Sequence, residues 1–184
     1  MSIFTSTRTT SLNDATSPTT TSWSGSSAGL LLLRWAVGLT MAAHGAQKLF
    51  GWFGGGGLDG TADFFASNGY SAAQTMAVVA GLTETLCGLG LVAGLLTPLA
   101  GAGIVGIMLN VIAVKWGGGF FSPTGIEFEL LLLVAAASLA LTGPGKLAAD
   151  RFLPVLRAHR LVHGVAAVAL GAVAAGITLV ILRS

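Results

Sequence analysis

The stretch LLLLRWAVGLTMAAHGAQKLFGWFG, Leu30 to Gly54, is long and apolar enough to cross a bilayer. It nevertheless carries Arg34, His44 and Lys48 within its hydrophobic register. Ionisable groups at membrane depth are costly, so a helix that keeps three of them is expected to hold them for a site rather than for anchoring. We therefore predict that the rest of the chain is a scaffold for this helix.

The overall composition indicates an integral membrane protein. Of the 184 residues, 53% are hydrophobic and 9% are charged, against roughly 25% charged in an ordinary soluble domain. The mean hydropathy is +0.82. The net charge of +2 comes from few ionisable groups and does not favour a nucleic-acid surface. A single cysteine, Cys87, excludes an internal disulfide, a CxxC redox pair and a four-cysteine zinc site, and we predict no metal site.

Five apolar segments predict an all-α membrane protein, with a four-helix transmembrane bundle and a fifth, C-terminal transmembrane helix. The spans are expected at about 29–51, 71–96, 97–116, 125–142 and 161–182. Thr97-Pro98 predicts a very tight turn between the second and third spans. We expect the glycine-rich run 54–60 to be a flexible loop that leads into a short amphipathic segment at 61–68.

Composition also divides the chain into three parts. Residues 1–28 are rich in serine and threonine and have no apolar run, which predicts a disordered tail. Residues 29–153 form the predicted four-helix membrane domain. Residues 154–184 hold a basic loop and the additional transmembrane helix.

The basic connection after the fourth span predicts the orientation in the membrane. It carries Lys146, Arg151, Arg157 and Arg160, and lysine and arginine near helix ends are retained on the cytoplasmic side. We expect a multi-pass protein of the cell membrane, embedded in the lipid bilayer, with a cytoplasmic N-terminus and an extracytoplasmic C-terminus.

In this orientation most intramembrane polar side chains gather in the outer half of the bundle. His44 and Lys48 are four residues apart and share a helix face, and Glu84 falls near the middle of the second span. Glu127 and Glu129 are two residues apart, so at most one should point into a site. The candidates for binding a ligand or a proton are His44, Lys48, Glu84, Asn110 and Glu127.

Each candidate also has a structural interpretation. Arg34 and Lys48 could snorkel to opposite membrane interfaces. His44 and Asn110 could hydrogen-bond neighbouring helices. Glu84 is the hardest to explain in this way, because a carboxylate at mid-membrane must be protonated or paired.

Small residues recur on two of the predicted spans. Gly101, Gly103 and Gly106 predict a helix-packing face on the third span, since no strand precedes them as nucleotide binding would require. On the fifth span Ala167, Gly171 and Ala175 stand at four-residue spacing. That stripe suits either docking on the bundle or self-association into an oligomer.

Several motifs, in order, resemble the DoxX family of small bacterial membrane proteins over about residues 29–153. They are Arg34, His44-Gly45, Lys48-Leu49-Phe50-Gly51, Glu84, Gly88, Gly94, Thr97-Pro98, Gly119-Phe120-Phe121, Glu127, Gly143-Pro144-Gly145 and Asp150. The resemblance implies a four-helix membrane core, with Arg34 and Asp150 among its motif residues, here assigned a structural or interface role. Lys115 departs from the family, which often has a histidine at that place, and the fifth span lies outside the family core.

The resemblance further implies a link to oxidoreductase assemblies, since some relatives resemble subunits of a thiosulfate:quinone oxidoreductase. We therefore expect an oxidoreductase subunit that holds a quinone or another small ligand at the His/Lys/Glu cluster, with electrons supplied by partner subunits. Two alternatives remain from the residues alone. One is a small proton-coupled transporter or channel, and the other is a structural assembly factor of a membrane complex.

Overall fold

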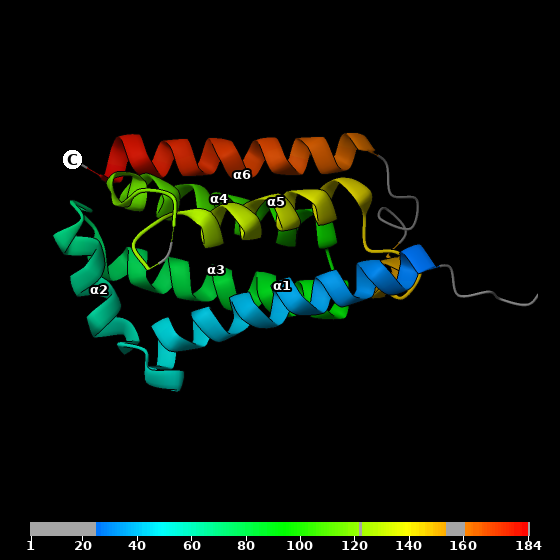
Figure 1. Ribbon diagram of the computed structural model, residues 1–184, viewed down its shortest axis with the longest axis horizontal. Coiled ribbons are helices and arrows are strands. Elements are labelled where there is room, and N and C mark those ends of the chain that lie inside the picture. The colour runs from blue at the N-terminus through cyan, green and yellow to red at the C-terminus, as the bar shows by residue number, and fades with distance from the viewer. Residues whose placement is uncertain (1–24, 122, 154–160, 184) are drawn as a thin grey trace, which may run out of the picture.

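The computed structural model describes residues 25–121, 123–153 and 161–183. Within these ranges long helices run alternately up and down beside one another, and one short helix lies across an end of the bundle (Figure 1). The long helices are α1 (Gly25–Phe50), α3 (Ala73–Ala93), α4 (Thr97–Lys115), α5 (Glu127–Thr142) and α6 (Leu161–Leu182), and the short one is α2 (Gly57–Ser67). Single 3-10 turns follow α1 and α4 and precede α6, as η1 (Trp52–Gly54), η2 (Trp116–Gly118) and η3 (Ala149–Phe152).

The predicted all-α membrane fold is confirmed. The helices α1, α3, α4 and α6 are each long and apolar enough to cross a membrane. The helix α5 has 16 residues, which is about 24 Å of rise and less than the roughly 30 Å of a hydrocarbon core. It still packs along both α4 and α6. The chain is thus a multi-pass membrane protein.

The connections differ from the sequence prediction in one place. The helix α2 begins at Gly57, four residues before the expected amphipathic segment, so most of the run 54–60 is ordered as a 3-10 turn and a helix rather than as a flexible loop. The tight turn before Thr97 is present, because α3 ends at Ala93 and Gly94 adopts a left-handed conformation with φ of 66°. The predicted tail and the arginines at 157 and 160 lie outside the described residues.

Glycines bring α1 and α3 into backbone contact. A Cβ atom on Gly88 would lie 2.5 Å from the Ala42 nitrogen, and one on Gly45 would lie 2.6 Å from the Thr85 nitrogen. No side chain fits in such a gap, so only glycine allows this approach. The close contact fixes the register that sets Lys48 of α1 beside Glu84 of α3.

The helix α4 lies at the centre of the bundle, and its glycines face three different neighbours rather than one. A Cβ atom on Gly101 would meet the backbone of α5, one on Gly103 would meet Sγ of Cys87 in α3, and one on Gly106 would meet the backbone at Gly171 in α6. The predicted packing role of these glycines is confirmed, and it extends around the helix.

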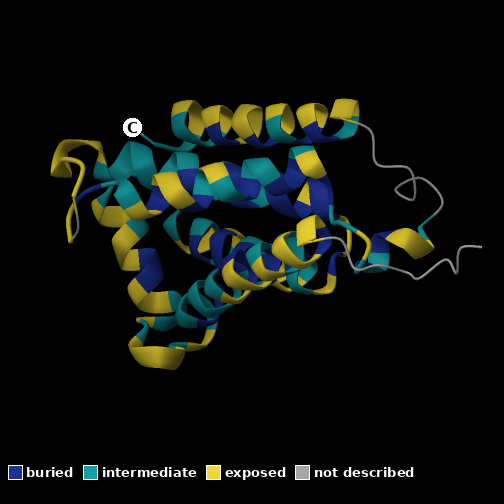
Figure 2. Cartoon of the chain, turned by 45° about the vertical axis from the view of Figure 1, so that its right-hand side comes forward, coloured by how far each residue is buried: buried dark blue, intermediate teal, exposed yellow. Residues whose placement is uncertain are grey.

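The helix α6 docks on this bundle through its small residues. Ala167, Gly171 and Ala175 are buried, and a Cβ atom on Gly171 would collide with the Ala102 carbonyl of α4. The outward side of α6 is exposed along its length (Figure 2). Of the two roles left open by the sequence, the stripe serves packing on the bundle.

The end of α6 is also tied to the connection between α2 and α3. The Ser71 nitrogen donates a hydrogen bond to the Leu182 carbonyl at 2.9 Å, and Nε of Arg183 donates to the Asn68 carbonyl at 3.2 Å. The helix that lies outside the predicted four-helix core is therefore held at its end as well as along its side.

Candidate functional site

Lys48 and Glu84 form an ion pair between α1 and α3. Nζ of Lys48 lies 2.7 Å from Oε2 of Glu84, and the two side chains are 27% and 2% exposed. The buried carboxylate has the ammonium group as its counter-charge, so removing Lys48 alone would leave an uncompensated charge in the bundle. Two candidates named from the sequence are thus in direct contact.

His44 lies one turn before Lys48 on the same helix. Its ring faces Phe128 of α5, with the ring centroids 6.1 Å apart, and it is close enough to Glu84 for an electrostatic interaction. The structure therefore places the histidine beside the ion pair, between α1 and α5.

A small cavity of about 50 Å³ borders the ion pair. Lys48, Glu84, Asn110 and Tyr70 are among the residues around it, and the surface that lines it is apolar. Oη of Tyr70 donates a hydrogen bond to Oδ1 of Asn110 at 3.2 Å, and Nδ2 of Asn110 donates to the Gly106 carbonyl at 3.0 Å. A space of this size can hold a water or a single oxygen-bearing group, but not a whole cofactor ring.

Tyr70 is a site residue that the sequence analysis missed. It stands in the connection between α2 and α3 and is 4% exposed. Burial raises the pKa of its phenol above the ordinary value, and the positive charge of Arg183 opposes this to a lesser extent. The hydroxyl therefore stays protonated, as a hydrogen-bond donor requires, to a higher pH than an exposed tyrosine would allow.

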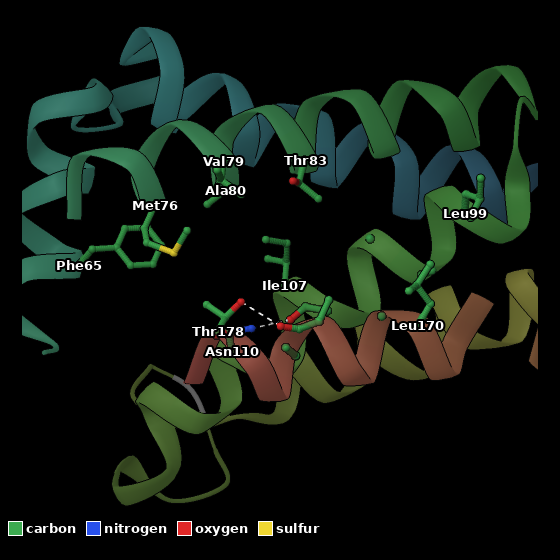
Figure 3. A pocket seen from close by; sticks show the side chains of 16 residues that line it. Phe65, Met76, Val79, Ala80, Thr83, Leu99, Ile107, Asn110, Leu170 and Thr178 are labelled. Carbon is green, nitrogen blue, oxygen red and sulfur yellow. Dashed lines mark hydrogen bonds between the residues drawn. The ribbon is translucent and has the colours of Figure 1, made fainter. Parts of the chain in front are cut away.

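A larger apolar groove of about 330 Å³ lies between α3, α4 and α6 and adjoins the small cavity. Figure 3 shows Val79, Ala80 and Thr83 of α3 facing Ile107 of α4 across this space. The groove and the small cavity share four lining residues, Phe65, Ala80, Ile107 and Asn110. The two spaces are thus neighbours separated by common walls.

A second ion pair joins α4 to α5. Nζ of Lys115 lies 2.8 Å from Oε1 of Glu129, and Glu129 is 8% exposed. Neither residue lines the small cavity or the groove. Lys115, which departs from the family pattern, thus has a carboxylate partner. Glu127, the candidate from this part of the sequence, lies in the first turn of α5 and likewise lines neither space.

Arg34 is buried at the opposite end of α1 and does not snorkel, since it is 1% exposed. Its guanidinium donates four hydrogen bonds of 2.7–3.0 Å to backbone carbonyls. Two acceptors belong to the last turn of α3 and two to the segment after α5: Leu91, Val92, Pro144 and Leu147. One side chain therefore closes the end of α3 onto the loop that follows α5.

Asp150 completes this end of the bundle. Its carboxylate accepts hydrogen bonds from the backbone nitrogens of Leu96 at 2.6 Å and Thr97 at 3.0 Å. These are donors at the start of α4, where a negative charge also complements the helix dipole. Asp150 is 1% exposed, and its two acceptor oxygens are used by the backbone. Arg34 and Asp150 thus hold helix ends, in line with the structural role assigned to them.

Comparison with known proteins agrees with this architecture. The family model described as DoxX matches residues 29–117. The chain is 34% identical over 126 residues to a Bacillus subtilis protein named "Putative oxidoreductase CatD", an alignment that covers 68% of this chain and 87% of the relative. No solved structure matches the chain. Within the described ranges, His, Cys, Asp and Glu side chains form no group of three that could hold a metal ion.

The resemblance read from the order of the motifs is therefore confirmed on two counts, the family model and the relative. The match begins where the predicted membrane domain begins, and it includes Arg34, His44, Lys48 and Glu84. The chain belongs to the DoxX family.

Proposed function

We propose that the protein is a membrane subunit of an oxidoreductase assembly and that it holds a quinone-like ligand beside the Lys48–Glu84 pair. The observation that carries the proposal is that this ion pair borders a cavity. An ion pair that only joins two helices needs no space beside it, because helix interfaces are otherwise close-packed. The name of the Bacillus subtilis relative supports the redox class.

The chemistry of the side chains suits a quinone. A lysine ammonium has three N–H donors, and the hydrogen bond to Glu84 uses one of them. The others can donate to a carbonyl oxygen of a ligand. Reduction of a quinone to a quinol takes two electrons in total and one proton for each of the two carbonyl oxygens. In this proposal Lys48, Glu84 and His44 relay the protons, and a redox cofactor in a partner subunit supplies the electrons.

Two other functions use the same residues and predict different behaviour. In a small proton-coupled transporter or channel, Glu84 and His44 would bind a proton or a solute, and reconstituted protein would carry a flux. In a structural assembly factor, the ion pair would be interhelical only, and replacing Glu84 would leave function unchanged.

Native mass spectrometry of the protein extracted with its lipids tests the proposal. The wild type is expected to retain a mass that matches a membrane quinone, and Glu84→Gln is expected to lose it because the amide removes the charge that orients Lys48. Glu129→Gln is the matched control, since it alters the other ion pair, which lines neither space. A wild type without bound quinone that carries protons or solute into liposomes would replace the proposal with the transporter.

A further inference from the structure

We infer that the groove between α3, α4 and α6 holds the ring and the hydrocarbon chain of the ligand, so the substrate class is a single-chain amphiphile rather than a small water-soluble molecule. This inference rests on the proposed function, because it directs a polar oxygen of the same ligand toward the Lys48–Glu84 pair. The first argument is size. The small cavity of about 50 Å³ has room for one oxygen-bearing group but not for a ring, whereas the groove of about 330 Å³ lies in the range of ligand pockets.

The second argument is the shared lining. Asn110 contributes to both spaces, and Ala80 and Ile107 lie on the same common wall. These side chains form the layer between the groove and the small cavity, so no helix stands between a ligand in the groove and the ion pair. A ligand confined to the groove would leave the charged pair without a function, and a ligand confined to the cavity would leave the groove empty.

The third argument is the chemistry of the groove wall. Its polar side chains already have hydrogen-bond partners, because Nδ2 of Asn110 donates to the Gly106 carbonyl and Oγ1 of Thr178 donates to the Ala174 carbonyl at 2.9 Å (Figure 3). The wall otherwise presents aliphatic and aromatic groups, apart from Thr83. Such a surface offers contacts to methylene groups and gives a polar solute little to bind.

The fourth argument is direction. The groove extends from Asn110 to Leu99 along α4, which is about 16 Å of helix rise and roughly half of a bilayer core. Asn110 lies toward the end of the bundle that α2 covers, and Leu99 is in the first turn of α4 at the other end. A head group at the ion pair thus has its chain directed along the membrane normal, as lipids in a bilayer do.

The fifth argument is the origin of the space. Small residues on α4 and α6 leave it open, namely Gly103, Gly106, Gly171, Ala174 and Ala175. The walls belong to three helices that are long and apolar enough to cross a membrane, so the medium outside the groove is hydrocarbon and a chain can enter from the bilayer. The helix α6 lies beyond the residues matched by the family model, which makes chain binding a property that this helix adds.

The test uses two probes with the same head group: a dimethoxy-methyl-benzoquinone with a decyl chain, and the same ring without the chain. Binding is measured with the full chain in nanodiscs of one lipid composition. Ala174→Phe fills the groove and should weaken binding of the decyl probe by about tenfold while changing binding of the chainless ring by less than about twofold. Ala169→Phe, on the opposite and exposed face of α6, should change neither.

The possible outcomes separate the inference from the proposed function. If Glu84→Gln abolishes binding of the chainless ring but Ala174→Phe leaves the decyl probe unaffected, the groove inference is wrong and the function stands. If Ala174→Phe weakens the decyl probe and Glu84→Gln affects neither probe, the chain site stands without the head site, and the substrate class argued above is overturned. A dimer that Ala174→Phe converts to monomer, with no dependence on chain length, would assign the groove to a second copy instead.

A measurement that needs no variant keeps the inference falsifiable if Ala174→Phe does not fold. A decyl probe with a diazirine at the chain end should label the deep end of the groove, at Leu99 or Leu170. Labelling that is as strong on the outward face of α6, at Ala169, would overturn the groove as the chain site.

Discussion

Arg34 and Lys48 are cations on the same helix, fourteen residues apart, yet their surroundings differ in kind. Arg34 is 1% exposed and gives its hydrogen bonds to four backbone carbonyls. Lys48 is 27% exposed, bonds to one side chain and borders a cavity. A charge whose partners are all backbone groups holds the fold, because each partner is itself part of a helix end or a turn. A charge paired with a side chain beside open space is free to change partner.

The largest effect is therefore expected from Arg34. Arg34→Met should remove about 3–5 kcal/mol of stability, because four backbone carbonyls lose a buried, charged donor. Arg34→Lys should restore little, since one ammonium group cannot reproduce the planar fork that reaches four acceptors. Thermal unfolding in detergent measures both variants.

The matched control is Arg151→Met at the same end of the bundle. Arg151 is exposed and stacks on Phe152 at 4.6 Å, so its loss should cost less than about 1 kcal/mol. Equal destabilisation by the Arg34 and Arg151 variants would show that the four hydrogen bonds of Arg34 do not hold the fold.

A smaller effect on stability is expected from Glu84. Glu84→Gln should change the free energy of unfolding by about 1 kcal/mol or less, because glutamine keeps the volume and Lys48 can turn toward its exposed side. Ligand retention should nevertheless be lost. Unfolding and native mass spectra recorded on one preparation give both quantities. A Glu84→Gln protein as unstable as Arg34→Met would assign the Lys48–Glu84 pair to the fold.

The smallest perturbation tests which end of the bundle faces the cytoplasm. With Cys87 replaced by alanine, single cysteines at Lys146 and Gly117 place a label on two exposed positions at opposite ends. We expect an impermeant thiol reagent to label Gly117→Cys in intact cells and to spare Lys146→Cys until the cells are opened. The reverse pattern would place the Lys48–Glu84 pair in the cytoplasmic half.

The sequence predicted the fold and part of the site, and particular residues explain which features could be predicted and which could not. Long apolar runs and the Thr97-Pro98 break determine helices and turns locally, and the spacing of His44 and Lys48 places them on one face of α1. Tyr70 could not be found in this way, because it lies in a connection with no periodicity. The hydrogen-bond partners of Arg34 could not be predicted either, since they are backbone carbonyls, which every residue has.

The pairing of Lys115 with Glu129 shows the same limit in another form. It depends on how α5 returns beside α4 after the turn at η2, and a sequence spacing of 14 residues does not fix that geometry. The sequence holds one indication of this ion pair, because Lys115 and Glu129 stand at adjoining ends of antiparallel helices. The cavity and the groove had no such signal, since an empty volume depends on the packing of every helix around it.

The hydrogen bonds from Ser71 and Arg183 can form only late in the synthesis of the chain. They join positions that are 111 and 115 residues apart, which a ribosome separates by about 6–20 s at ordinary elongation rates. During that interval α1 and α3 can pair, but α4 lacks α6, the neighbour that covers Gly106. Nascent chains arrested before α6 should thus insert into the membrane and remain unable to receive a lipophilic ligand. Under the proposed function, acquisition of the ligand is a late step of biogenesis, after α6 leaves the translocation machinery.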